Sequence, residues 1–289
     1  MPGRRRFRLK LPSRTLVLGE QTLVMGVLNV TPDSFADGGR YFRTSAAVAR
    51  ALEMQQAGAD LLDIGGESTR PGSKGVSAEE EIGRILPVLE KLRGKLRIPI
   101  SVDTQKARVA EAAVAAGAEI INDVSALRSD PALAEVVRRH RLPIVLMHMR
   151  GEPRTMQEGP FARNVLLDVK NGLHAAIARA RKAGIARSQI IVDPGIGFGK
   201  SYAQNFELLA RLRELAALGY PLLVGASRKR FIGATLATAD GEWPPDERVW
   251  GTAATVTAAI LGGAHIVRVH DVAEMVQVVR IADAVAQSR

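Results

Sequence analysis

The 289-residue sequence contains no cysteine, and this absence excludes several classes of protein. Without thiols there are no disulfides, no zinc fingers and no thiolate-bound metal centres. Aromatic residues make up only 4% of the chain, whereas proteins that bind single-stranded nucleic acid stack bases on aromatic side chains. No apolar run reaches the roughly 18 residues of a membrane span, and no apolar segment follows the basic N-terminus as in a signal peptide. We therefore expect a soluble cytoplasmic protein that binds neither nucleic acid nor membrane.

Negative charge is also in short supply, because 30 Asp and Glu face 40 Lys and Arg and leave a net charge of +10. Such an excess favours anionic partners, and with nucleic acid set aside these are small anionic substrates. Part of the excess lies in the basic segment 1–14, which we expect to be a mobile tail. Residues 15–289 contain no linker or low-complexity segment, which predicts a single domain there.

A strand followed by a helix recurs eight times along the chain. The β-branched runs 98–102, 119–121 and 142–147 illustrate the pattern, since a helical segment follows each of them. Such alternation predicts parallel strands with right-handed crossovers, and eight units close into a barrel more readily than into an open sheet. The apolar runs 15–18 and 22–28 flank a Gly-Glu turn and predict a hairpin. The predicted fold class is α/β, a single (β/α)8 TIM barrel with a short N-terminal β-hairpin.

Every predicted strand ends in a polar residue, and a barrel brings all eight strand ends to one face. They are Asn29, Asp63, Asp103, Asn122, His148, Asp193, Lys229 and His270. One Asp or Asn alone is as often a helix cap as a ligand, but eight strand-end residues indicate a shared site. Carboxylates and amides at one mouth suit a flat heterocycle with several N–H groups, because a carboxylate accepts two parallel hydrogen bonds. We expect Asp63 to contribute least, holding only the glycines of its own loop in place.

A glycine-rich stretch, 193–200, follows the apolar, β-branched run 190–192. Its glycines lack the spacing of a dinucleotide fingerprint, and Pro194 stands where a P-loop requires glycine. The last predicted strand carries Arg268 and His270, at a position where such barrels often hold phosphate. Asn29 and a substrate phosphate can share Mg²⁺, which prefers few protein oxygens.

Several segments in order resemble dihydropteroate synthase, a family of the pterin-binding barrel group. The likeness extends from Met25 to Val272 and rests on residues 26–35, 65–72, 101–104, 121–125, 147–149, 193–200, 227–229 and 268–270. It implies condensation of 7,8-dihydropterin-6-ylmethyl diphosphate with 4-aminobenzoate, which releases pyrophosphate and gives 7,8-dihydropteroate. It also implies Mg²⁺ as cofactor and a homodimer.

The resemblance assigns roles to individual positions. The residues that would hold the pterin are Asp103, Asn122, Asp193 and Lys229, with Met147 in the pocket wall. Those that would bind the diphosphate are Asn29, Arg70, Arg268 and His270, with Asn29 acting through Mg²⁺. The 4-aminobenzoate pocket would be formed by Phe35, Thr69, Arg70, Pro71, Phe198 and Ser227. The implied catalytic set is Asp33, Asp103, Lys229, Arg268 and His270.

Two other functions remain open at this point. One is a pterin-binding protein without this activity, either a non-catalytic paralogue or the barrel of a corrinoid-dependent methyltransferase. Residues 69–72 and 227–229 argue against it, because a methyl carrier has no use for an aminobenzoate pocket. The other is an aldolase-type barrel with Lys229 as Schiff-base lysine, since Arg228 and Arg230 would lower its pKa.

Overall fold

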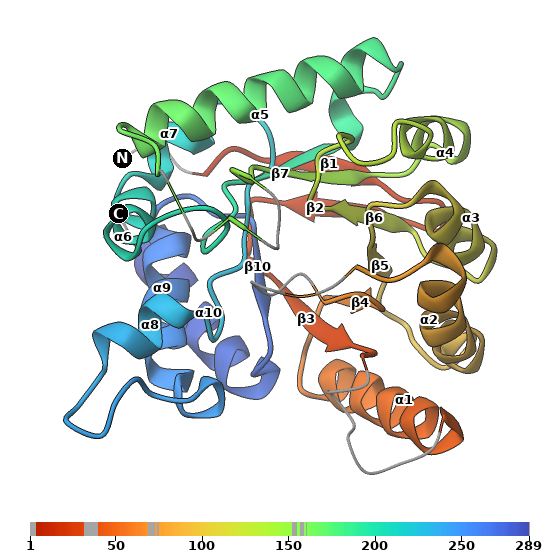
Figure 1. The fold of residues 1–289 in the computed structure, drawn as a ribbon, viewed down its shortest axis with the longest axis horizontal. Coiled ribbons are helices and arrows are strands. Elements are labelled where there is room, and N and C mark those ends of the chain that lie inside the picture. The colour runs from red at the N-terminus through yellow and green to blue at the C-terminus, as the bar shows by residue number, and fades with distance from the viewer. Residues whose placement is uncertain are drawn as a thin grey trace.

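A ring of parallel strands surrounded by helices makes up the computed structural model (Figure 1). The structure describes residues 4–31, 40–68, 73, 75–151, 155–156, 159 and 161–288, and of 40–43 only the backbone. The strands form one eight-stranded sheet in the order β8-β7-β6-β5-β4-β3-β10-β9. A parallel bridge between Val192 and Leu222 links the first strand of that order to the segment beside the last, so the ring is nearly closed. The predicted TIM barrel is confirmed.

The barrel strands are short and lie where the sequence predicts them. They are β3 (Leu23–Asn29), β4 (Leu61–Gly65), β5 (Ile100–Asp103), β6 (Ile120–Asp123), β7 (Ile144–Met147), β8 (Ile190–Asp193), β9 (Leu223–Val224) and β10 (Ile266–Val269). Neighbouring strands pair in parallel throughout, for example Met25 with Leu61 and Met147 with Asp193. All the strands therefore present their carboxyl ends at one opening of the barrel, which we call the mouth.

The helices pack around the outside of this ring (Figure 1). They are α1 (Arg40–Gln56), α2 (Ala78–Leu92), α3 (Ala107–Ala115), α4 (Leu133–His140), α5 (Val165–Lys182), α6 (Tyr202–Ala210), α7 (Leu212–Ala216), α8 (Arg230–Thr235), α9 (Val249–Leu261) and α10 (Val272–Gln287), with 3₁₀ turns η2 (Arg187–Gln189) and η3 (Pro245–Glu247). Side-chain caps start several of them, as where Ser77 accepts from the Glu80 N–H. Among the described residues, none of the helices combines the length and apolar character needed to cross a lipid bilayer.

The interior of the barrel is layered, because side chains two positions apart on a strand point to the same side. In β4, Leu61 lies in a buried apolar cluster at the amino end, and Asp63 lies one step closer to the mouth. The outward residue Leu62 packs instead in the larger cluster between strands and helices. The same step relates three further pairs, Ile120 and Asn122, Ile191 and Asp193, and Ile266 and Arg268. The polar side chains therefore lie at the mouth, above a layer of apolar side chains inside the barrel.

Residues 4–14 of the basic N-terminal segment pack against the barrel, where their charge predicts a mobile tail. β1 (Phe7–Lys10) pairs antiparallel with β2 (Thr15–Leu18), so the predicted hairpin exists but uses this upstream strand and not residues 22–28. Leu9 is 1% exposed and joins the apolar cluster inside the barrel, while Arg8 and Lys10 point to solvent. The alternation of apolar and basic residues is that of a half-buried strand, and burial of the apolar face stabilises it despite the charge.

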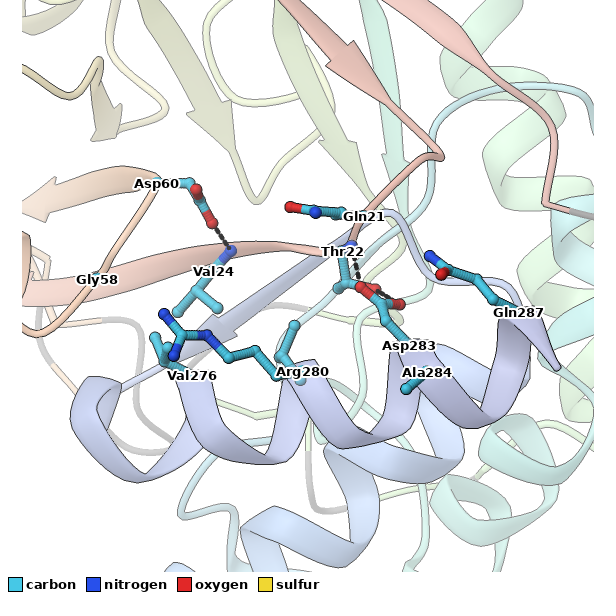
Figure 2. Close-up of a pocket in the computed structure, with 11 residues that line it drawn as sticks. Gln21, Thr22, Val24, Gly58, Asp60, Val276, Arg280, Asp283, Ala284 and Gln287 are labelled. Carbon is cyan, nitrogen blue, oxygen red and sulfur yellow. Dashed lines mark hydrogen bonds between the residues drawn. The ribbon is translucent and has the colours of Figure 1, made fainter.

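A pocket of about 410 Å³ lies at the amino end of the barrel, between the starts of β3 and β4 and α10 (Figure 2). Two of its lining carboxylates already bond to the protein. Asp283 accepts from the Thr22 N–H at 2.6 Å and from Arg4 Nη2 at 2.9 Å, and Asp60 accepts from the Val24 N–H at 2.8 Å. This pocket lies at the opposite end from the mouth, and its acids serve to tie the barrel's amino end together.

Candidate active site

A network of charged and amide side chains crosses the barrel just below the mouth. Asp63 Oδ2 accepts hydrogen bonds from Arg268 Nε at 2.6 Å and from Asn122 Nδ2 at 2.9 Å. Arg268 Nη2 also donates to Asp103 Oδ2 at 2.9 Å. These residues come from β4, β5, β6 and β10, so the fold joins Arg268 to three of the eight predicted strand-end residues.

Asp63 has a larger part in this network than the sequence suggests. The sequence predicts that it holds only the glycines of its own loop, yet its side chain is 0% exposed and joins Arg268 to Asn122. Its Oδ1 has no hydrogen-bond partner within the described residues. The signal that would have found it is its period-two relation to Leu61, which places both side chains inside the barrel.

Two carboxyls at the mouth have strongly shifted pKa values. Burial raises the pKa of Asp103 to about 7, with Arg268 opposing the shift and Asp63 adding to it. Burial also raises the pKa of Asp193 to about 6, while a hydrogen bond from the Gly195 N–H and the charge of Lys229 act against it. Both carboxyls therefore change between their protonated and ionised forms close to neutral pH, which is common for carboxyls in functional sites.

An apolar wall stands beside these carboxyls. Met147 and Phe198 are 3% and 8% exposed and pack in one cluster with Val124, Met149 and Met156. Lys229 Nζ lies 4.0 Å from the centroid of the Phe198 ring, a cation–π distance. The site thus combines a polar floor with an apolar side, as sites for flat heteroaromatic ligands commonly do.

The turn 227–229 is held in an unusual backbone conformation. Arg228 has a φ of +58°, and its N–H donates to Thr252 Oγ1 at 3.1 Å while its carbonyl accepts from Arg248 Nη1 at 2.9 Å. On its two sides this turn presents Ser227 and Lys229. We attribute the left-handed residue to the need to turn both of its neighbours toward the mouth.

The arginines beside Lys229 are both engaged elsewhere. Arg228 Nε donates to Asp271 Oδ2 at 3.0 Å, and Arg230 Nε donates to Glu242 Oε2 at 2.9 Å. The Schiff-base hypothesis depends on these two cations lowering the pKa of Lys229. Because a carboxylate neutralises each of them, the structure gives that hypothesis no support.

Ser227 and His270 form the edge of the site nearest β10. Ser227 Oγ lies 3.0 Å from His270 Nδ1 and accepts from the His270 N–H at 3.2 Å. Burial, together with the charges of Arg268 and Arg228, lowers the pKa of His270 to about 3. The imidazole is therefore neutral at physiological pH and offers a hydrogen bond to an anion without carrying a charge of its own.

Asn29 ends β3 and is half-buried beside the network. A Cβ built on Gly65 would lie 3.8 Å from Asn29 Oδ1 and 3.5 Å from Asp103 Cβ, so glycine keeps this space open. No group of three His, Asp or Glu side chains within the described residues has a metal-binding arrangement. A cation beside Asn29 would therefore take one amide oxygen from the protein and its other ligands from substrate and water, a set that fits Mg²⁺.

Not every predicted site residue is placed in this network. Asp33, Phe35, Thr69, Arg70 and Pro71 fall outside the described residues, and their roles stay predictions. His148 directly follows β7, one residue beyond the strand that the sequence predicts it to end, and it contacts Lys200 and Asp168 in place of the network around Asp63.

Comparison with known proteins gives one consistent result. The family model described as pterin binding enzyme matches residues 25–270. The dihydropteroate synthase of Synechocystis sp. (strain PCC 6803) is 49% identical over 266 residues, which cover 92% of this chain and 91% of that protein. The Xanthomonas albilineans dihydropteroate synthase structure with 4-aminobenzoic acid has 47% identity and a TM-score of 0.89, and covers 97% of this chain and 98% of that one.

A second structure of the Xanthomonas albilineans enzyme, in complex with 7,8-dihydropteroate, has 45% identity and a TM-score of 0.85. It covers 96% of this chain and 98% of that one. Family model, sequence relatives and solved structures therefore agree over almost the whole chain. The chain belongs to the dihydropteroate synthase family of pterin-binding enzymes, transferases of folate biosynthesis.

Proposed function

We propose that this protein condenses 7,8-dihydropterin-6-ylmethyl diphosphate with 4-aminobenzoate, giving 7,8-dihydropteroate and pyrophosphate. The observation that carries the proposal is the pair Asp103 and Asp193, two buried carboxyls with raised pKa values at the mouth of one barrel. The related enzymes described above support it, since one was solved with 4-aminobenzoic acid and another with 7,8-dihydropteroate.

The pterin is assigned to the polar floor. Asp193, Asn122 and Asp103 offer carboxylate and amide groups that match the alternating N–H and oxygen edge of a pterin. Lys229 lies close enough to Asp193 to influence its pKa, and it is placed to donate to a ring oxygen or nitrogen. Met147 supplies the apolar contact for the ring face.

The diphosphate is assigned to Arg268, His270 and Asn29. Arg268 uses two of its N–H groups on Asp63 and Asp103, and a guanidinium has five such donors, so further donors are available for phosphate oxygens. His270 adds a neutral hydrogen bond. Mg²⁺ held between Asn29 and the diphosphate would supply charge neutralisation for the leaving group.

The reaction needs positioning more than covalent help from the protein. The amine nitrogen of 4-aminobenzoate forms a bond to the pterin methylene carbon while the C–O bond to the diphosphate breaks. The bonding electrons leave with pyrophosphate, and the new secondary amine loses one proton to water or to the departing pyrophosphate. Arg268 stabilises the developing negative charge, and Asp103 and Asp193 stabilise positive charge that builds up on the pterin.

Pyrophosphate release tests the proposed function directly. The purified protein is mixed with the pterin diphosphate, 4-aminobenzoate and Mg²⁺, and pyrophosphate and dihydropteroate are measured together. We expect equal amounts of both products. Folded protein that forms neither product contradicts the proposal, and pterin binding without aminobenzoate binding, measured by calorimetry with pyrophosphate present, would favour the methyltransferase-like alternative.

Pterin binding should weaken in acid at an unusually high pH. The carboxylate form of Asp193 accepts the pterin N–H groups, and burial raises its pKa to about 6. Protonation therefore removes the acceptor as the pH falls through about 6, and not near 4 as for an exposed Asp. Calorimetric affinities for a pterin between about pH 5 and pH 8 check this, and an affinity that is constant over that range contradicts the assigned role.

We propose that the protein acts as a homodimer in the cytoplasm. Support for the dimer comes from exposed aromatic side chains on α6 and α9, where Phe206 is 41% and Trp250 is 75% exposed. Large exposed apolar side chains on adjacent helices commonly mark an interface. Sedimentation should give twice the mass of the 31.0 kDa chain, and Trp250→Glu should shift the protein toward the monomer. A wild-type monomer at micromolar concentration would overturn the proposed dimer.

A further inference from the structure

Lys200 is a buried lysine that the proposed reaction does not use. It lies near the end of the loop between β8 and α6, is 1% exposed and is one of the largest fully buried side chains. Its ammonium group does not point to the mouth. It donates to the carbonyl of Gly195 at 2.8 Å and to the carbonyl of Phe198 at 2.9 Å, so it ties the two sides of the loop together from within.

A second set of contacts fixes the ammonium group itself. Lys200 Nζ lies 3.1 Å from His148 Nδ1, and His148 Nε2 lies 3.3 Å from Asp168 Oδ2 on α5. Burial, together with the charge of Lys200, lowers the pKa of His148 to about 2, so the ring is neutral. Its single N–H then belongs on Nε2, facing Asp168, and the Nδ1 lone pair faces Lys200.

These contacts offset the free-energy cost of burying the Lys200 ammonium group. Taking an ammonium group out of water lowers the pKa of Lys200 to about 7, while the charges of Asp193 and Asp168 favour its protonated form. A methionine would fill the same space without that cost, so packing alone does not require a lysine here. The ammonium group is explained by what it holds, namely two loop carbonyls and a histidine oriented by Asp168.

The loop that Lys200 holds has little room to take another shape. Gly195 and Gly199 have φ values of +65° and +64°, and each lies directly on the segment that follows β7. A Cβ on Gly195 would approach the His148 carbonyl to 1.9 Å, and one on Gly199 would approach the Arg150 carbonyl to 2.2 Å. Phe198 stands between these two anchored glycines, so its position is set by the loop backbone.

The position of Phe198 matters to the site because its ring lies 4.0 Å from Lys229 Nζ and packs with Met147. We propose that Lys200, through its bond to the Phe198 carbonyl, is a positioning residue that sets the wall of the 4-aminobenzoate pocket. The inference rests on the proposed function, which supplies the second substrate. Of the proposed pterin contacts, Asp103 and Asn122 come from β5 and β6 and do not depend on this loop. Asp193 does bond to the Gly195 N–H and senses the charge of Lys200, so the variants are assayed at about pH 8, where this carboxyl is ionised.

Lys200→Met tests the inference, with Lys182→Met as the matched control. Lys182 is exposed in the last turn of α5. For Lys200→Met we expect the KM for 4-aminobenzoate to rise about tenfold or more while the KM for the pterin diphosphate changes by less than about threefold. A merely structural role would lower the folded fraction and hence kcat, and would leave both KM values unchanged. That second pattern overturns the proposal.

Asp168→Asn keeps the inference testable if Lys200→Met does not fold. Asp168 is 29% exposed at the start of α5, and its loss should release His148 and raise the KM for 4-aminobenzoate about two- to threefold. Arg150→Gln is the control, because Arg150 contacts the other oxygen of Asp168 at 3.2 Å. An unchanged KM in Asp168→Asn, with Lys200→Met unfolded or unchanged, overturns the proposal. Inactive wild-type protein in the same assay would instead contradict the proposed function.

Discussion

Asp193→Asn is expected to weaken pterin binding by about 100-fold or more, because a hydrogen-bonded carboxylate contributes about 1.5–3 kcal/mol per charged hydrogen bond. In the proposed complex the carboxylate accepts from ligand N–H groups, whereas an amide presents one oxygen and one NH₂ group, and the NH₂ would face a donor. The Gly195 N–H that now bonds to Asp193 Oδ1 at 2.7 Å would compete for the one remaining oxygen. Calorimetry with a pterin measures the loss of affinity.

Asp60→Asn is the matched control for this experiment. Asp60 is also a carboxyl whose pKa is raised by partial burial, but it is more exposed than Asp193 and lies at the amino end of the barrel. Its substitution should leave pterin affinity within about twofold, since distant sites without shared partners act independently. Thermal unfolding of both variants confirms that they are folded. A folded Asp193→Asn variant with wild-type affinity would show that the pterin does not lie on this carboxylate.

The convergence of the site could be predicted because it depends on barrel topology. Once eight parallel strands close, residues as distant as Asp63 and Arg268 must meet at the mouth, whatever the loops do. Asp103, Asn122 and Asp193 were identified in the same way, from apolar runs that end in a polar residue. The alternation of strands and helices is therefore enough to predict which residues meet at the mouth, and the identity of single side chains adds little to that prediction.

The pairing of the side chains could not be predicted, because it depends on distances that no pattern encodes. The sequence does not show that Arg268 contacts Asp63 and not solvent, or that Lys200 turns inward to bond the Phe198 carbonyl. The N-terminal strand was missed for a related reason. The basic residues of 4–10 predict a mobile tail, but the apolar residues at alternate positions decide which face of the strand is buried.

Arg268→Met is expected to have the largest combined effect on activity and stability. The guanidinium bonds to Asp63 at 2.6 Å and to Asp103 at 2.9 Å, and Asp63 is completely buried. Removing one partner of a buried ion pair costs about 3–5 kcal/mol, because a buried charge remains without compensation. Catalysis should fall as well, by about a thousandfold in kcat/KM, since the donor that we propose neutralises the diphosphate is lost. Urea unfolding and pyrophosphate release measure the two effects.

The pH dependence of the stability loss separates this explanation from simple loss of packing. Asp103 has a pKa of about 7 in the folded protein, above its ordinary value of 3.8, and Arg268 is what limits the shift. A carboxyl with a raised folded pKa stabilises the native state while protonated, and this stabilisation is lost as the pH rises through the folded pKa. Without Arg268 that pKa rises further, so the deficit should be largest near about pH 8.5 and should shrink toward about pH 6.

Arg4→Met provides the comparison for Arg268→Met. Arg4 also pairs with a buried carboxylate, Asp283, at 2.9 Å, but at the amino end of the barrel. It should lower stability while leaving the KM values for both substrates unchanged, because no mouth residue contacts it. A stability deficit in Arg268→Met that is the same at both pH values would mean that the lost guanidinium did not act through the charge of Asp103.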